Sequence, residues 1–138
     1  MPWTEHFPDG CPPENAHPVS GKVYRFVDND IPEADDFHSW REQNPSQPCP
    51  PGLTECQTCG LSVFTTEEGV CTALRRKPFL RKKKPALGTL TSEFGVILNT
   101  PSQGKKGTGE NHHTWWVSLN AEPWKVFHVI TVTCPDSE

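Results

Sequence analysis

No apolar run in this chain of 138 residues approaches the roughly 18 residues that cross a bilayer, so we expect no membrane contact. The first ten residues, MPWTEHFPDG, contain neither the basic region nor the apolar region of a secretory leader. These two absences predict a cytoplasmic protein. Apolar residues make up only 33% of the chain, although 7 Phe, 5 Trp and 1 Tyr add volume, which fits one small domain.

Familiar catalytic motifs are also missing. The chain has no GxxxxGK[ST] loop and no GxGxxG loop, the two glycine-rich patterns that hold nucleotide phosphates. It has neither HExxH nor GxSxG, and no serine lies in a paired catalytic motif. These absences argue against ATP-driven chemistry, HExxH-type zinc proteases and α/β-hydrolases.

Charge is strongly segregated along the chain, although the net charge is only −4. Residues 1–74 have 12 acidic and 3 basic side chains, residues 75–109 have 9 basic and 1 acidic, and residues 110–138 have 4 acidic and 1 basic. This asymmetry predicts an anionic partner, or a basic loop packed against an acidic face of the same chain. Within the basic segment, the candidates for ligand binding are Lys82, Lys83 and Lys84.

Proline and hydrophobic patterning predict an extended arm over residues 1–20 and a single α+β domain over residues 21–135. Ten of the 15 prolines lie in the first 51 residues, where they disfavour helix. We expect a mostly antiparallel sheet of five to six strands with two short helices. The candidate strands are 22–27, 61–65, 86–91, 94–99, 113–119 and 125–133. The candidate helices are 35–43 and a segment that begins at the capping-box pattern of Thr65 and Glu68 and ends before Pro78. The last two strands are predicted to form a hairpin, with the final one central because both its faces are apolar.

Six cysteines leave three interpretations open. Cys56 and Cys59, followed by Gly60, have the spacing of half a structural zinc site. No second CxxC completes it, so the remaining ligands would come from Cys49 and from either Cys71 or Cys11. Disulfides and free thiols are the alternatives: a reducing compartment favours thiols or a metal site, and a secreted chain favours disulfides.

The pentapeptide HHTWW, residues 112–116, is the least ordinary segment. Side chains alternate along a strand, so His112 and Trp116 point to one face and His113 and Trp115 to the other. One histidine can therefore enter a pocket beside an indole while the other meets solvent. Arg25, between two valines of the first strand, must either pair with nearby aspartates or bind an anion.

Three strand segments together resemble the bacterial ADP-ribosyltransferase-like superfamily: VYRF at 23–26, LSVFTT at 61–66 and HHTW at 112–115. That family has an Arg or His on its first strand, a Ser/Thr segment on a middle strand and a polar residue on a late strand. The resemblance implies an NAD-like ligand, with Arg25, Ser62, His112 and His113 as catalytic candidates. The family's late Glu is absent from the third segment, and Glu110 is the nearest acid. CGLSVF with HHTWW is also similar to a small bacterial family of uncharacterised domains.

The sequence therefore predicts a domain that binds a phosphate-bearing ligand, either an NAD-like nucleotide or an RNA end. Arg25 and the lysine-rich segment would hold the phosphates, and Trp115 or Trp116 would stack on a base. His112 or His113 would transfer a proton, and Arg25, Ser62, His113 and Trp115 are expected to line one pocket. The alternative is a non-catalytic module, stabilised by zinc, that binds nucleic acid or a protein partner.

Overall fold

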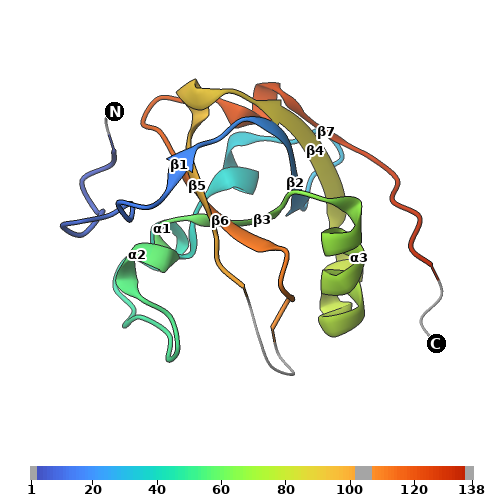
Figure 1. Ribbon diagram of the computed structural model, residues 1–138, viewed down its shortest axis with the longest axis horizontal. Coiled ribbons are helices and arrows are strands. Elements are labelled where there is room, and N and C mark those ends of the chain that lie inside the picture. The colour runs from blue at the N-terminus through green and yellow to red at the C-terminus, as the bar shows by residue number, and fades with distance from the viewer. Residues whose placement is uncertain (1–2, 102–106, 136–138) are drawn as a thin grey trace.

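The computed structural model describes residues 3–101 and 107–135, and its main feature is one antiparallel sheet (Figure 1). Within these residues the sheet has seven strands, and three α-helices and several 3₁₀ helices connect them. The strands are β1 (His17–Pro18), β2 (Gly21–Val27), β3 (Leu61–Phe64), β4 (Lys84–Leu90), β5 (Gly95–Asn99), β6 (His112–Val117) and β7 (Phe127–Val129). The helices are α1 (Trp40–Gln43), α2 (Glu55–Thr58) and α3 (Glu67–Arg76). The α+β class and the antiparallel sheet are confirmed, with more strands than the five to six predicted.

The strand order β1-β5-β6-β3-β2-β4-β7 corrects two expectations about the end of the chain. β7 lies at an edge and pairs with β4, so the predicted hairpin with β6 and the predicted central position are both wrong. The 3₁₀ helix Pro123–Lys125 turns the chain after β6, and Phe127 then pairs with Gly88 of β4. The apolar residues that suggested a central strand pack in two different places. Phe127 lies in the main core, whereas Ile130 and Val132 pack on a second hydrophobic cluster.

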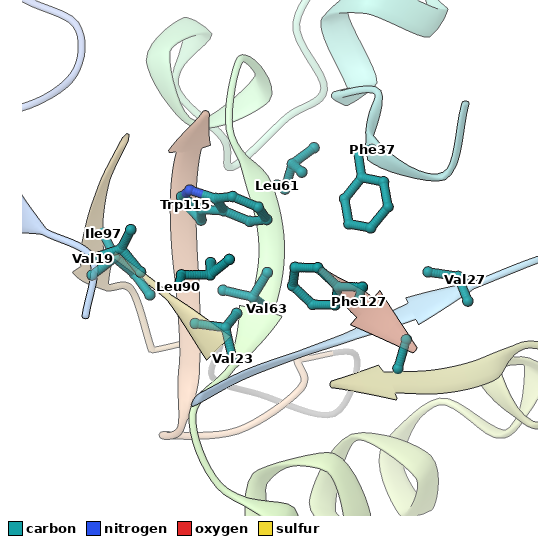
Figure 2. Close-up of a cluster of buried hydrophobic side chains, with 11 residues drawn as sticks. Val19, Val23, Val27, Phe37, Leu61, Val63, Leu90, Ile97, Trp115 and Phe127 are labelled. Carbon is teal, nitrogen blue, oxygen red and sulfur yellow. The ribbon is translucent and has the colours of Figure 1, made fainter. Parts of the chain in front are cut away.

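The concave side of the sheet encloses the main hydrophobic core (Figure 2). Trp115 of β6 is fully buried there, and its indole stacks against Phe127 with ring centroids 5.9 Å apart. Phe37 lies edge-on to Trp115 and also contacts Phe127, and Figure 2 shows the three rings together in the core. The indole N–H donates to the carbonyl of Phe94 at 2.9 Å, which satisfies the one polar atom of the ring.

Helix α3 covers part of the opposite side of the sheet. The hydroxyl of Thr66 accepts a hydrogen bond from the N–H of Gly69 and caps the helix one residue later than the sequence pattern suggested. Val70 and Ala73 of the helix pack against Tyr24 and Phe64, the side chains of β2 and β3 that point away from the main core. The helix ends at Arg76, two residues before Pro78, which begins a 3₁₀ helix.

The segment predicted as one helix over 35–43 is split in two. A 3₁₀ helix, Ala34–Phe37, and the single-turn helix α1 are separated by Ser39, whose hydroxyl caps α1. The reason is local: Ser39 and Glu42 form a reciprocal capping box, which starts a new helix at Trp40. The break places Phe37 in the core and leaves Trp40 half-buried on the outer side.

The N-terminal arm is tied to the domain at two points. His17 and Pro18 form β1, which pairs with β5 and adds an unpredicted strand to the sheet. Cys11 forms a disulfide with Cys56 of α2, and a second disulfide joins Cys71 of α3 to Cys134 near the C-terminus. Among the described residues no helix is long and apolar enough to cross a membrane.

Candidate functional site

An opening between two neighbouring strands forms the centre of the site. β2 and β3 pair at a single position, Tyr24 opposite Phe64, and then separate. Arg25, the next residue of β2, occupies the gap: its Nη1 donates to the carbonyl of Ser62 at 2.9 Å, and its Nε donates to the carbonyl of Asp36 at 2.9 Å. The guanidinium thus takes the place of backbone hydrogen bonds that would otherwise pair β2 with β3, and it reaches the face of the sheet opposite the main core.

Arg25 carries its charge in an unfavourable position. Among the described ion pairs it has no carboxylate partner, and it binds two backbone carbonyls instead. Burial lowers the pKa of Arg25 to about 10, although the nearby charges of Asp36 and Asp28 partly oppose this effect. A drop of this size corresponds to about 3 kcal/mol against the charged form. The chain therefore maintains a positive charge here at a cost to stability.

The carboxylate of Asp36 is not free to neutralise Arg25, because other donors use it. It accepts hydrogen bonds from the N–H groups of Asp28 and Glu33 and from the side chain of Asn29, all at 2.8–2.9 Å. Burial alone would raise the pKa of Asp36, but these hydrogen bonds outweigh burial and lower it. Asp36 therefore fixes the turn after β2, and its backbone carbonyl positions the guanidinium.

Ser62 and His112 face each other on β3 and β6. The Oγ of Ser62 lies 3.0 Å from Nε2 of His112, and Nδ1 of the same ring lies 2.8 Å from the backbone carbonyl of Thr100. The carbonyl can only accept, so Nδ1 carries the proton and Nε2 presents its lone pair to the serine hydroxyl. Burial lowers the pKa of His112, and the charges of His113 and Lys77 act in the same direction against the Thr100 hydrogen bond.

A pocket of about 540 Å³ connects these groups. Its polar and charged lining includes Arg25, Ser62, His112, Lys77, Lys83 and Thr108, and an adjoining pocket of about 220 Å³ shares most of them. None of the described residues that line either pocket is Asp or Glu. In a chain whose net charge is −4, a lining with three cationic side chains and no acid favours anions.

Two further features make the pocket suitable for a ligand. The hydroxyl of Thr108 is buried at the pocket wall and finds no hydrogen-bond partner among the described residues. A buried polar atom without a partner is costly in a folded protein, so a ligand group there would be stabilising. Trp40 and Phe79 also line the pocket; Phe79 is 58% exposed, and both offer aromatic surface to a planar group.

The structure brings together three of the four catalytic candidates and separates the fourth. Arg25, Ser62 and His112 line the pocket of about 540 Å³, whereas His113 lines a different pocket on the other face of β6, beside β1 and β5. The Nδ1 of His113 lies 2.9 Å from the carbonyl of Asn111. The expected pocket containing Arg25 and His113 together is therefore corrected to one containing His112, because the register of β6 turns His112 toward Ser62.

The two tryptophans of HHTWW are not available to stack on a base. Trp115 and Trp116 are both fully buried, the first in the main core and the second beneath α2, where its indole donates to the carbonyl of Cys56. Gly60 explains the close approach of this segment, because a Cβ at that position would collide with Thr114. The aromatic role predicted for Trp115 and Trp116 is therefore corrected, and Trp40 is the pocket's indole.

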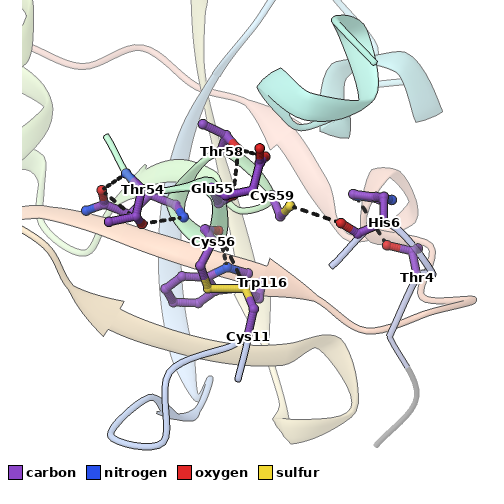
Figure 3. The surroundings of a disulfide bond; sticks show 10 residues. Thr4, His6, Cys11, Thr54, Glu55, Cys56, Thr58, Cys59 and Trp116 are labelled. Carbon is purple, nitrogen blue, oxygen red and sulfur yellow. Dashed lines mark hydrogen bonds between the residues drawn. A yellow bond between two sulfur atoms is a disulfide. The ribbon is translucent and has the colours of Figure 1, made fainter. Parts of the chain in front are cut away.

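The predicted zinc ligands do not form a site. The sulfur of Cys56 is bonded to Cys11 and cannot ligate a metal, and Cys59 is buried with its thiol 3.9 Å from the carbonyl of His6 (Figure 3). Within the described residues no cluster of three or more His, Cys, Asp or Glu side chains could hold an ion. Burial raises the pKa of the Cys59 thiol and thereby favours its protonated form.

The lysine-rich segment has divided roles. Lys83 lines the pocket and forms an ion pair with Asp28 at 3.0 Å, while Lys84 pairs with Asp30 at 3.4 Å. Lys82 is exposed and does not line the pocket. The alternative in which basic residues pack against acidic residues of the same chain therefore holds for two of the three lysines. Lys105 and Lys106 lie outside the described residues.

Sequence reasoning missed Trp40, Lys77, Phe79 and Thr108 as pocket residues. Trp40 lies in the segment predicted as one helix over 35–43, and the Ser39–Glu42 capping box was the signal that could have separated it from Phe37. Lys77 and Phe79 flank Pro78, the residue that ends α3, so their approach to β3 depends on the tertiary path of the chain.

In comparisons with known proteins, no family model, no curated protein and no solved structure matches this chain significantly. The function must therefore be argued from the pocket itself.

Proposed function

We propose that the pocket between β2, β3 and β6 binds a phosphate-bearing ligand of nucleotide size. The observation that carries this proposal is its lining, which contains Arg25, Lys77 and Lys83 and no acidic side chain among the described residues. A volume of about 540 Å³ is within the range of small-molecule sites. The dominant contacts would be charge-assisted hydrogen bonds to phosphate oxygens.

Arg25 provides the energetic reason for a ligand. Its charge is maintained against burial, and among the described residues its Nη2 makes no hydrogen bond. An incoming phosphate would give this charge a partner and occupy the remaining N–H groups in a two-point contact. Strongly perturbed groups of this kind gather at functional sites more often than elsewhere.

Aromatic and polar groups favour a nucleotide over a bare phosphate. Trp40 and Phe79 offer flat surfaces on which a base can stack, a contact worth about 1–3 kcal/mol. Gln43 and Gln57 line the same pocket and supply amide groups that can hydrogen-bond to base or ribose. We therefore favour a nucleoside diphosphate or an NAD-like dinucleotide as the ligand class.

The resemblance to ADP-ribosyltransferase-like domains supports the same ligand class. Its three segments lie on β2, β3 and β6, which are adjacent in the sheet order. The carbonyl of Ser62 accepts from Arg25, which ties the first segment to the second. However, no acidic residue takes the position of the family's late Glu in the pocket lining. We therefore carry over nucleotide binding and do not propose ADP-ribosyl transfer.

The two disulfides favour an oxidising compartment over the cytoplasm. Bonds of this kind persist in secreted and periplasmic proteins and are rare where thiols are kept reduced. We propose that the chain functions outside the cytoplasm, where both cross-links would remain closed.

Calorimetric titration of the chain with ADP tests the binding proposal. ADP should bind, adenosine should bind much more weakly because it lacks phosphate, and the affinity for ADP should fall as salt is raised. Thr108→Val is a useful second variant, because it removes the buried hydroxyl without changing side-chain shape or net charge. Equal affinity for ADP and adenosine, or no binding of ADP at low salt, would remove the proposal.

A further inference from the structure

Ser62 and His112 have the arrangement of an activated serine. The Oγ of Ser62 lies 3.0 Å from Nε2 of His112, within the range required of a nucleophile and its base. Both side chains line the pocket, and Ser62 is exposed. No single sequence motif contains both residues, because β3 and β6 bring them together from 50 residues apart.

The histidine is fixed in the tautomer that catalysis requires. Nδ1 donates to the carbonyl of Thr100 at 2.8 Å and also lies 3.0 Å from the hydroxyl of the same residue. That hydroxyl lies in turn 2.8 Å from the hydroxyl of Thr114, so the ring is held from one side by a connected set of groups. A backbone carbonyl takes the orienting place that a carboxylate has in the serine–histidine–aspartate arrangement.

We propose that Ser62 and His112 form a nucleophile–base pair that hydrolyses carboxylic esters of phosphate-bearing molecules. The phosphate preference rests on the function proposed above, whereas the nucleophile–base pair stands on its own geometry. The lining cations would hold the phosphate and thereby place the ester carbonyl near Ser62. Arg25, which donates a hydrogen bond to the carbonyl of Ser62, lines the same pocket as the pair.

The reaction balances with water as the co-reactant. The Oγ of Ser62 bonds to the carbonyl carbon while its proton moves to Nε2 of His112. The ester C–O bond then breaks, and the leaving alcohol takes that proton. Water attacks the acyl-serine and gives a proton to His112, which returns it to Ser62 as the carboxylic acid leaves.

The surroundings of His112 favour the neutral imidazole, the form that can accept a proton from Ser62. Lys77 follows α3, Arg25 projects from β2, Lys83 precedes β4, and His113 is its neighbour on β6. Burial is the largest cause that lowers the pKa of His112, and the charges of His113 and Lys77 act in the same direction against the Thr100 hydrogen bond. Activity should therefore be constant at neutral pH and fall on the acidic side of about pH 6.5, the ordinary range of histidine.

A neutral fluorophosphonate probe tests the pair without requiring a phosphate-binding site. The probe phosphorus bonds to Oγ of an activated serine, fluoride leaves, and the serine proton passes to the base. Intact-mass spectrometry followed by peptide mapping should find one adduct, at Ser62, and none in Ser62→Ala. His112→Asn should slow labelling by about 100-fold or more, the usual contribution of a general base.

His113→Asn is the matched control, because it makes the same chemical change on the next residue of the strand but on the opposite face. It should label at the parent rate, and near-ultraviolet circular dichroism should show that both variants are folded. His112→Gln serves as a second variant, since its amide can replace one hydrogen bond to Thr100. The labelling rate of the parent should fall below about pH 6.5.

The outcomes separate this inference from the binding proposal. Labelling of Ser62 that ADP blocks supports both. Labelling that ADP does not affect supports the nucleophile–base pair and removes its preference for phosphate-bearing esters. Absence of an adduct at Ser62, or equal labelling of His112→Asn and His113→Asn, overturns the nucleophile–base pair even if ADP binds.

Discussion

Replacing Arg25 by methionine should separate ligand binding from stability. Methionine keeps much of the length of the side chain and removes the charge. Burial lowers the pKa of Arg25 to about 10, so the substitution relieves a cost of about 3 kcal/mol. It also removes two hydrogen bonds from a charged donor, to Ser62 and Asp36, each worth about 1.5–3 kcal/mol. Because these effects oppose each other, the free energy of unfolding should fall by no more than about 3 kcal/mol.

Binding should change much more than stability. A phosphate that loses a two-point contact with a guanidinium loses about 2–3 kcal/mol, which lowers affinity by about 30- to 150-fold. Urea unfolding and calorimetric titration with ADP measure the two effects on the same protein. Lys22→Met is the matched control, because it removes one positive charge from an exposed position on the same strand, away from the pocket of about 540 Å³.

A contrary result for Arg25 is easily recognised. If Arg25→Met loses more than about 3 kcal/mol of stability while ADP affinity stays at the parent value, Arg25 is a structural residue that closes the gap between β2 and β3. If Lys22→Met weakens ADP binding as much as Arg25→Met, the effect comes from net charge and the pocket argument fails.

Three further predictions concern other parts of the chain. ADP should quench tryptophan fluorescence, and Trp40→Phe should abolish that response, because Trp40 is the one of the five tryptophans that lines the pocket of about 540 Å³; persistence of the response in Trp40→Phe would contradict the pocket assignment. Burial lowers the pKa of His112, so the imidazole binds a proton more tightly in the unfolded chain than in the folded one. The free energy of unfolding should therefore be highest above about pH 6.5 and decline as the pH falls below that value. Urea unfolding at several pH values should show a smaller decline for His112→Asn. A chelator should leave the melting temperature unchanged, whereas the double variant C11S/C56S should lose about 2–4 kcal/mol, since that disulfide closes a loop of 45 residues; a chelator-sensitive melting temperature would restore the zinc hypothesis.

Strand patterning allowed part of the site to be predicted from the sequence. Alternation placed Arg25 and Ser62 on strands and His112 directly before one, and it indicated that neighbouring histidines face opposite ways. It could not show which face of β6 meets the pocket, because that depends on the register in which Thr114 lies opposite Ser62. The choice between His112 and His113 therefore required the fold.

Contacts between distant segments account for what the sequence did not predict. The last strand carries apolar residues for two different clusters, which local patterning cannot distinguish from a strand buried on both faces. The pairing of Cys56 with Cys11 rather than with a metal likewise depends on the path of the arm, because spacing along the chain does not determine connectivity.

Mapping of amide chemical shifts on addition of ADP tests the central claim most directly, because it locates the ligand as well as detecting it. The account predicts that the largest changes fall on Arg25, Ser62, Thr108 and His112 and on the indole N–H of Trp40, with little change at His113 on the opposite face of β6. Changes confined to the exposed surface around Lys82, or changes that adenosine produces equally well, would contradict it.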